Sequence, residues 1–86
     1  MTAEVVVYTT DYCPYCDRAK ALLKKRDIAF DEIDVTNDPE KRTWLVEKTG
    51  RRTVPQVFVK GTPIGGSDEL HALDRSGELA KMLAPT

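Results

Sequence analysis

The strongest constraint on the fold is a short strand pattern that leads directly into a pair of cysteines. Residues 5–9 read Val-Val-Val-Tyr-Thr, and such a short β-branched, apolar run is typical of a strand buried on both faces. A polar loop follows, and then Cys13, Pro14 and Cys16. Pro14 suits the first position of a helix, where its missing N–H removes no hydrogen bond. The sequence therefore predicts a buried strand whose end meets a helix that begins at the cysteines.

The two cysteines are better explained by reactivity than by structural stabilisation. The 86-residue chain has only Cys13 and Cys16, whereas a secreted disulfide-stabilised domain of this size usually has roughly four to eight cysteines. A bridge between them would close almost no loop, so it would restrict the unfolded chain very little. A tetrahedral zinc site would need two further ligands, and the only histidine is His71. We therefore expect redox chemistry at this pair and no metal.

The next part of the chain predicts a strand and a helix. Residues 28–35 alternate loosely between apolar and polar side chains, which is typical of a strand. Asn37 or Asp38 is a natural N-cap for a helix with Pro39 at its first position. Gly50 is expected to end that helix.

The last third of the chain predicts two short strands and further helix. Residues 56–60 predict a third strand and Ile64 belongs to a fourth, with a tight turn expected at residues 61–63. Two glycines follow, and Ser67 is expected to cap a helix. Gly77 separates that helix from a last short helical segment.

The order of these elements is β-α-β-α-β-β-α, with a possible short helix at the end. The first two strands are joined by a helix and should be parallel, whereas the last two are joined by a tight turn and should be antiparallel. An α/β fold with a mixed four-stranded sheet and helices on both faces satisfies both requirements. A C-x-x-C motif after the first strand of such a unit indicates a thioredoxin-like redox protein. We expect residues 1–86 to form one thioredoxin-like domain.

Composition excludes several other classes of protein. Thirteen basic and 14 acidic side chains give a net charge of -1, which argues against a dedicated nucleic-acid-binding protein. No apolar run approaches the ~20 residues of a membrane helix. The acidic N-terminus is unlike a secretory signal. We expect a cytoplasmic protein, and a monomer because no apolar stripe is left over.

Cys13 and Cys16 are expected to have different chemistry. With Cys13 at the helix N-cap, its sulfur faces the unpaired N–H groups and the positive end of the helix dipole. Both effects favour the thiolate and lower the pKa of a cysteine in this position. Cys16 lies one turn further along the helix and closer to the core. We therefore expect Cys13 to be the nucleophile and Cys16 the resolving thiol.

Three motifs together resemble the dithiol glutaredoxins, most closely the small bacterial type. Residues 13–16 (Cys-Pro-Tyr-Cys) resemble the active-site motif of that family. Residues 53–55 (Thr-Val-Pro) and 65–68 (Gly-Gly-Ser-Asp) are similar to its other two signatures in order and spacing, so the resemblance covers essentially the whole chain. It implies a glutathione-dependent thiol–disulfide oxidoreductase with a thioredoxin-like fold. Glutathione would be the reducing co-substrate, with no permanently bound cofactor.

The resemblance also implies a glutathione-binding site. Pro55 would be in cis, so that the Val54 backbone pairs with the cysteine of glutathione. Gly66, Ser67 and Asp68 would form a helix N-terminus that binds the γ-glutamyl carboxylate, with the Asp68 side chain taking the ammonium group. The other implied contacts are Tyr15 beside the sulfur, Thr53, and both Arg42 and Arg52 for the glycine carboxylate.

The chain departs from the family pattern at Thr10. Many glutaredoxins have a lysine three residues before the nucleophilic cysteine, and its absence removes a cation that would support the thiolate. The pKa of Cys13 is therefore expected to lie above the value typical of the family. His71 and Trp44 are expected to be structural.

Two alternatives stay open at this point. The first is a glutaredoxin-like redoxin reduced by thioredoxin reductase, against which residues 65–68 and Arg52 argue. The second is an iron–sulfur carrier that holds a cluster between two subunits through Cys13 and glutathione. Pro14 disfavours it, because cluster-binding relatives usually have a small residue there. The expected protein partners are disulfide-containing or glutathionylated proteins, with ribonucleotide reductase as a candidate known only from the family.

Overall fold

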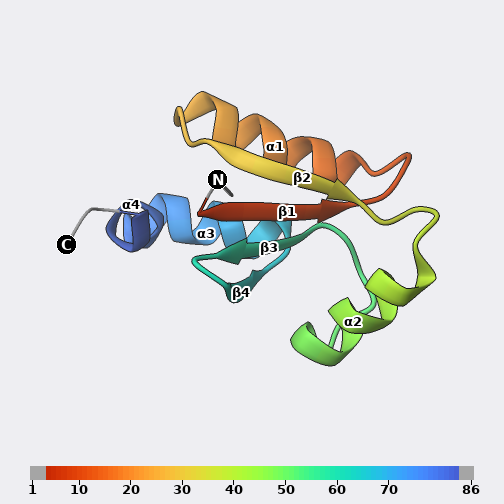
Figure 1. The fold of residues 1–86 in the computed structure, drawn as a ribbon. Helices are drawn as coiled ribbons and strands as arrows, with labels where there is room; N and C mark the ends of the chain where they lie inside the picture. The colour runs from red at the N-terminus through yellow and green to blue at the C-terminus, as the bar shows by residue number, and fades with distance from the viewer. Residues whose placement is uncertain (1–3, 84–86) are drawn as a thin grey trace.

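The computed structural model describes residues 4–83, and its elements follow the predicted order (Figure 1). The strands and helices are β1 (Val5–Thr9), α1 (Pro14–Lys25), β2 (Phe30–Asp34), α2 (Pro39–Thr49), β3 (Gln56–Val59), β4 (Thr62–Gly65), α3 (Ser67–Ser76) and α4 (Glu78–Leu83). The expected domain and the acidic N-terminus include residues 1–3 and 84–86, which lie outside the described residues. None of the helices within 4–83 is long and apolar enough to cross a membrane.

The sheet is mixed and has the strand order β2-β1-β3-β4. β1 and β2 are parallel, and β3 is antiparallel to both β1 and β4, so both predicted pairings are confirmed. β1 therefore has a neighbour on each side. Its position explains the valine run, because Val5 and Val7 are fully buried in the middle of the sheet.

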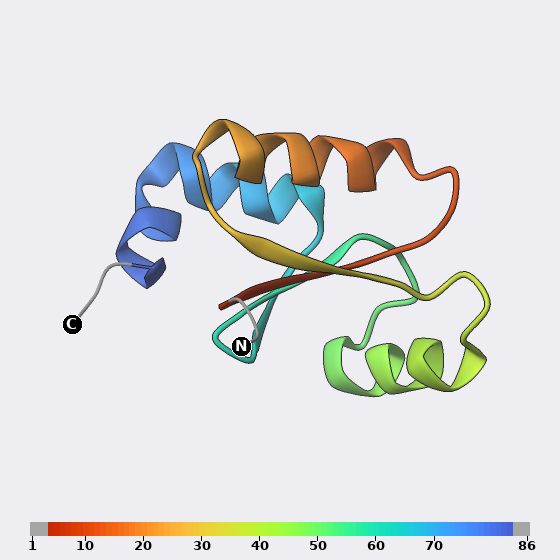
Figure 2. The same ribbon diagram turned by 45° about the horizontal axis from the view of Figure 1, so that its top comes forward.

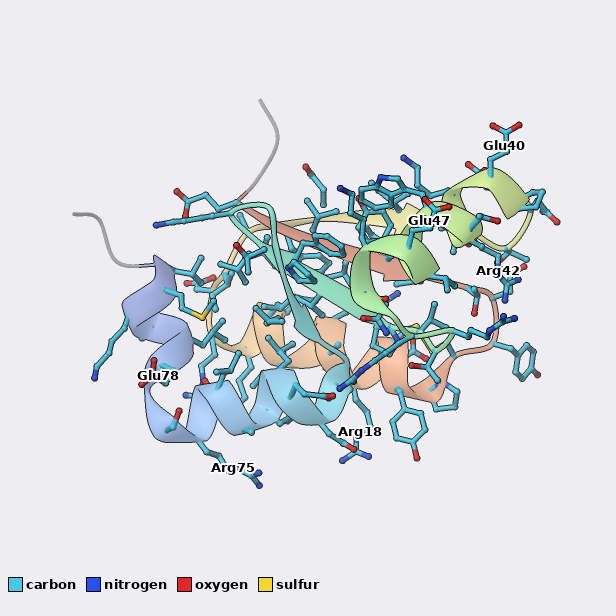
Figure 3. All side chains as sticks on the ribbon, turned by 90° about the horizontal axis from the view of Figure 1, so that it is seen from below. Arg18, Glu40, Arg42, Glu47, Arg75 and Glu78 are labelled. Atoms are coloured by element: carbon cyan, nitrogen blue, oxygen red, sulfur yellow. A yellow bond between two sulfur atoms is a disulfide. The ribbon has the colours of Figure 1, made fainter. Side chains whose placement is uncertain are left out.

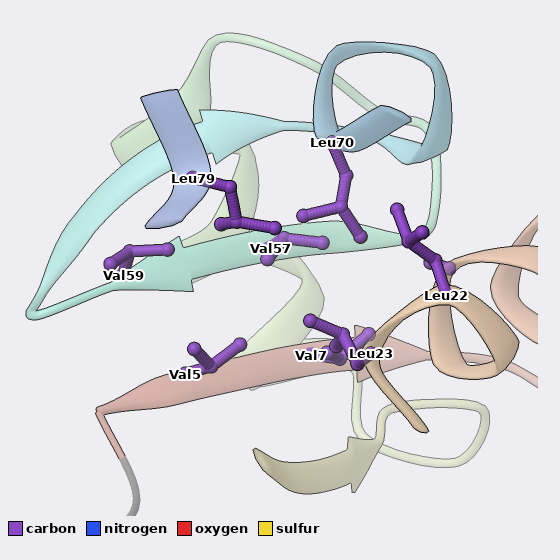
Figure 4. Close-up of a cluster of buried hydrophobic side chains, with 9 residues drawn as sticks. Val5, Val7, Leu22, Leu23, Val57, Val59, Leu70 and Leu79 are labelled. Atoms are coloured by element: carbon purple, nitrogen blue, oxygen red, sulfur yellow. The ribbon is translucent and has the colours of Figure 1, made fainter. Parts of the chain in front are cut away.

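The helices cover both faces of the sheet, as predicted. In Figure 2, α1 and α3 lie together on one face and α2 lies on the opposite face. The first face holds the larger core, in which α1 and α3 meet the valines of β1 and β3 (Figure 4). Its buried residues are Val5, Val7, Ala19, Leu22, Leu23, Val57, Val59, Leu70 and Leu79. Each of the large side chains contributes roughly 1.5–3 kcal/mol by leaving water.

A smaller aromatic core lies under α2. Tyr8 and Phe58 meet edge to face with ring centroids 5.3 Å apart, and Trp44 of α2 stacks on Phe58 at 5.7 Å. Val35 and Leu45 complete the cluster. Trp44 therefore has the structural role expected of it, and it attaches α2 to the sheet.

The turn and the helix cap expected on either side of β4 are wrong. Thr62 and Pro63 belong to the strand, and the chain turns instead at Lys60 and Gly61, whose φ angles of 51° and 82° are those of a two-residue hairpin. Pro63 is tolerated because β4 is an edge strand. Ser67 is the first residue of α3, and its N-cap is Gly66.

α1 and α3 are also joined at the ends far from the cysteines. Arg26, which ends α1, donates two hydrogen bonds to the Asp74 carboxylate of α3, at 2.9 and 3.0 Å. This pairing holds the pKa of Asp74 below its ordinary value. The two helices that lead to the site are therefore fixed to each other by a side-chain contact as well as by the core.

Candidate active site

Cys13 and Cys16 lie at the N-terminus of α1, immediately after β1 and its connecting loop. Cys13 is the N-cap, in extended conformation, and its Sγ accepts a hydrogen bond from the Cys16 backbone N–H at 3.1 Å. The two cysteines form a disulfide. Cys16 is buried, with only 1% of its surface exposed, whereas Cys13 is partly exposed. Only the first of the two sulfurs is therefore open to an incoming substrate.

The loop before β3 brings a second backbone segment to Cys13. The Val54–Pro55 peptide bond is cis, and the Val54 carbonyl oxygen lies 3.8 Å from Cys13 Sγ. Gln56, which is 1% exposed, braces this loop by donating from Nε2 to the Thr53 carbonyl oxygen at 2.8 Å. Gln56 was expected only to begin a strand. Its position inside the protein, which the sequence does not reveal, turns it into a support for the loop.

The N-terminus of α3 forms the opposite side of the site. Its N-cap, Gly66, has no side chain to accept the N–H groups of the first turn. The Glu69 carboxylate accepts the Gly66 N–H, so the N–H groups of Ser67 and Asp68 are the ones available to a ligand. A Cβ atom on Gly66 would lie 3.2 Å from the Pro55 carbonyl oxygen. Glycine therefore allows the end of α3 to approach the cis-proline loop closely.

A groove made of two adjoining parts follows the cis-proline loop, whose Val54 carbonyl oxygen lies close to Cys13 Sγ. One part, about 260 Å³, lies between the cis-proline loop and α3, and the other, about 300 Å³, lies between the same loop and α2. The two parts share Arg51, Thr53 and Val54, so we treat them as one groove. All nine residues predicted to contact glutathione line it: Tyr15, Thr53, Val54, Pro55, Gly66, Ser67 and Asp68 in or next to the first part, and Arg42 and Arg52 in the second. Figure 3 shows Arg42 projecting from α2.

The groove also contains two charged residues that the sequence motifs do not predict. Arg51, on the cis-proline loop, makes a close ion pair with Glu69 of α3. The other Glu69 oxygen accepts the Gly66 backbone N–H at 3.3 Å. The Arg51 guanidinium holds the pKa of the Glu69 carboxyl below its ordinary value. This pair therefore ties the two walls of the groove together.

Gly65 makes the position of Glu69 possible. Its φ of +114° is accessible to glycine, and a Cβ atom there would lie 2.8 Å from Glu69 Cγ. A glutamate three residues after an N-cap is a recognised capping signal, so Glu69 could have been found from the sequence. Arg51 carries no comparable local signal.

The other charged residues near the cysteines have partners of their own. Lys20 Nζ lies 3.0 Å from Glu32 Oε2, which lowers the pKa of Glu32 and raises that of Lys20. The Arg18 guanidinium lies 6.0 Å from the centre of the Tyr15 ring. Within residues 4–83 no group of three or more histidine, cysteine, aspartate or glutamate side chains is arranged to hold a metal ion.

Comparison with known proteins agrees with this geometry. The family model described as Glutaredoxin matches residues 5–64. The chain belongs to the glutaredoxin family. It is 49% identical over 80 residues to a glutaredoxin of Pseudomonas aeruginosa, covering 93% of this chain and 95% of the relative. It is 44% identical over 81 residues to glutaredoxin 3 of Escherichia coli K12, covering 94% and 98% of the two chains.

A solved structure extends the likeness to three dimensions. The crystal structure of a buckwheat glutaredoxin–glutathione complex superposes with a TM-score of 0.87 at 34% identity, covering 94% of this chain and 76% of the other. The predicted thioredoxin-like fold is thereby confirmed. As a glutaredoxin with a C-x-x-C pair, the chain is a glutathione-dependent thiol–disulfide oxidoreductase. Its relatives favour neither the redoxin nor the iron–sulfur carrier.

Proposed function

We propose that Cys13 is the nucleophile and Cys16 the resolving thiol of this oxidoreductase. The observation that carries the proposal is the contrast between the two sulfurs. Cys13 Sγ is partly exposed and accepts the Cys16 N–H at the end of α1, whereas Cys16 is 1% exposed. An N–H donor and the positive end of the helix dipole stabilise a thiolate at Cys13. That thiolate is the species that attacks a disulfide.

With a glutathionylated protein, Cys13 alone completes the reaction. Its thiolate attacks the glutathione sulfur, a Cys13–glutathione disulfide forms, and the protein cysteine leaves as a thiolate. A second glutathione thiolate then attacks the glutathione sulfur of that adduct. This step releases oxidised glutathione and returns Cys13 to its thiolate form.

With a protein disulfide, both cysteines take part. Cys13 attacks one sulfur of the client, forming a mixed disulfide and releasing the other client thiolate. Cys16 then attacks Cys13 Sγ, which releases the reduced client and leaves the Cys13–Cys16 disulfide present in the structure. Two glutathione molecules reduce that disulfide and leave as oxidised glutathione.

We propose one orientation for glutathione in the groove. The Val54 backbone would pair with the cysteine of glutathione beside Cys13 Sγ, to which its carbonyl oxygen is already close. The Ser67 and Asp68 N–H groups at the N-terminus of α3 would bind the γ-glutamyl carboxylate, and the Asp68 side chain would bind the ammonium group. Arg42 and Arg52, at the other end of the groove, would bind the glycine carboxylate. The glutathione bound in the buckwheat relative supports this proposal.

We further propose that the clients are disulfide-containing or glutathionylated proteins of the cytoplasm, ribonucleotide reductase among the candidates. The cytoplasmic glutathione pool is reducing enough to drive both reactions.

The test is NADPH consumption with a small disulfide substrate in two parallel reactions. One contains glutathione and glutathione reductase, and the other contains thioredoxin reductase alone. We expect rapid turnover only in the glutathione reaction. Turnover only with thioredoxin reductase would contradict the proposed use of the groove and favour the redoxin.

A further inference from the structure

Gln56 is a polar residue in an otherwise apolar, buried strand. It begins β3 and is 1% exposed, and the three residues that follow it, Val57, Phe58 and Val59, pack into the two cores. A glutamine at this depth has lost its contacts with water. Its hydrogen bonds within the protein therefore decide what its burial costs.

The two ends of the Gln56 amide differ in their hydrogen bonds. Nε2 donates to the Thr53 carbonyl oxygen at 2.8 Å and lies 3.4 Å from Thr53 Oγ1. Oε1 is buried and has no hydrogen-bond partner among residues 4–83. Exchanging the nitrogen and the oxygen would set Oε1 against the Thr53 carbonyl oxygen, so the bond to Thr53 requires this orientation. An unpaired buried acceptor destabilises the folded state.

The fold does not need this amide to satisfy Thr53. Thr53 is exposed, so water can donate to its backbone in place of Gln56. An apolar side chain of the same length at position 56 would fill the same space and leave no unpaired oxygen. Stability alone therefore favours an apolar residue, and the use of an amide points to an effect on the loop that it contacts.

The bond from Gln56 to Thr53 spans the part of the cis-proline loop that faces the reactive sulfur. Val54 lies between the two bonded residues, and its carbonyl oxygen is 3.8 Å from Cys13 Sγ. Gln56 itself is fixed in the sheet, where it pairs with Tyr8 of β1. The amide therefore connects the position of the loop to that of the rigid sheet.

We propose that Gln56 is a positioning residue of the glutathione site. Its bond to Thr53 holds the Val54 backbone in the place where the cysteine of glutathione pairs with it, which lowers the entropy cost of that pairing. Gln56 touches neither glutathione nor a reacting atom, and it acts through the loop. This proposal rests on the proposed role of Val54 in binding glutathione.

The experiment measures single turnovers of the reduced protein with two forms of one peptide. The cysteine of the peptide carries glutathione in one form and 2-mercaptoethanol in the other. 2-Mercaptoethanol has no peptide groups, so it cannot pair with the Val54 backbone. The second-order rate constant for consumption of each mixed disulfide is measured, together with Tm, for wild type, Gln56→Met, Gln56→Asn and Thr9→Val.

Wild type is expected to consume the glutathionylated form faster. Gln56→Met keeps the length of the side chain and removes both amide groups. It should lower the rate constant for the glutathionylated form by about tenfold, as for the loss of one hydrogen bond, and leave that for the 2-mercaptoethanol form unchanged. Its Tm should be unchanged or higher, because the unpaired oxygen is gone. Gln56→Asn is one methylene too short to reach Thr53, so it should show the same selective loss with a lower Tm.

Thr9→Val is the matched control, because it also removes a hydrogen bond from a buried polar residue. Thr9 is 2% exposed, and its Oγ1 donates to Glu32 Oε2 at 2.9 Å, away from the cis-proline loop. We expect Thr9→Val to lower Tm and to leave the ratio of the two rate constants unchanged.

Two results would overturn the proposal. An unchanged ratio in Gln56→Met and Gln56→Asn would show that the amide does not position the glutathione site. An equal fall in both rate constants would show that Gln56 acts on Cys13 or on the fold as a whole. If wild type consumed both forms at the same rate, the proposed binding of glutathione in the groove would itself be wrong, and this proposal would fail with it.

Discussion

The N-termini of α1 and α3 both lie close to the cis-proline loop and are capped in different ways. α1 is capped by the sulfur of Cys13, which accepts the Cys16 N–H at 3.1 Å. α3 begins at Gly66, which has no side chain, and Glu69 in its first turn accepts the Gly66 N–H at 3.3 Å. The positive end of α1 is therefore directed at the reactive sulfur, whereas the Ser67 and Asp68 N–H groups of α3 are left for a ligand.

The comparison shows one physical feature used for two purposes. In α1 the N–H groups stabilise the Cys13 thiolate, so they affect the rate of the thiol–disulfide exchange step. In α3 they are available to a carboxylate, so their effect falls on binding. Changes at α1 should therefore alter kcat, and changes at α3 should alter KM.

The largest expected effect is at the α1 end. Cys13→Ser should abolish activity on every substrate, because the serine hydroxyl is not ionised at neutral pH and cannot replace the thiolate. Cys16→Ser should largely keep the reduction of glutathionylated proteins and lose the reduction of protein disulfides. Both variants are assayed with glutathione and glutathione reductase. Equal loss in both variants on glutathionylated substrates would contradict the assigned roles.

The next largest effect is at the α3 end. A Cβ atom in Gly66→Ala would press on the Pro55 carbonyl oxygen and move the helix end away from the loop. We expect KM for glutathionylated substrates to rise by about tenfold, as for the loss of one hydrogen bond to a charged group, with kcat nearly unchanged. Gly77→Ala is the control. A Cβ atom at Gly77 would meet no atom within 4 Å, so its effect comes only from the φ of +83°. A fall in kcat without a change in KM would break the distinction between the two helix ends.

A smaller effect is expected from the ion pair that joins the groove walls. Glu69→Gln removes the charge opposite Arg51 and keeps an oxygen for the Gly66 N–H. KM for glutathionylated substrates should rise a few-fold, and Arg51→Ala should match it because both variants break the same contact. Added salt should reduce the difference from wild type, since the pair is partly exposed. If KM fell instead, the pair would be an obstacle to glutathione rather than a support for its site.

The smallest effect is expected where α1 and α3 are joined far from the site. Asp74→Asn should lower Tm by roughly 1–3 °C at neutral pH and leave both kinetic constants unchanged. The folded-state pKa of Asp74 is lowered by Arg26, so this stabilisation is complete above the unfolded pKa of about 3.9 and is lost as the pH falls through the folded value. Thermal unfolding of wild type and Asp74→Asn between pH 7 and pH 2 measures this stabilisation. A Tm difference that grew toward low pH would contradict the assignment.

Much of the fold could be predicted because its signals are local. The valine run indicates the central strand, and Pro14 and Pro39 mark helix starts that the structure shows at those residues. The turn predicted at residues 61–63 was wrong because proline is typical of a turn. Pro63 is permitted in β4 only because β4 is at the edge of the sheet.

The site was harder to predict where it depends on contacts between distant segments. Arg51 and Glu69 are 18 residues apart and meet only because α3 packs beside the cis-proline loop. The Asp11 backbone N–H donates to Thr36 Oγ1, 25 residues further along the chain, and no pattern near Asp11 indicates this contact. The motif residues were found because three separate motifs resemble one family, and that resemblance carried information about tertiary contacts.

NMR of one stable adduct tests most directly whether the N-termini of α1 and α3 bind the two ends of one glutathione molecule. The Cys16→Ser variant is reacted with oxidised glutathione, so that Cys13 holds one glutathionyl group, and its backbone amide shifts are compared with those of the reduced variant. The account predicts large shifts in three places: at the turn of Cys13, at Val54, and at Ser67 and Asp68 of α3. Shifts confined to the turn of Cys13 would contradict the claim that α3 binds the far end of the same glutathione molecule.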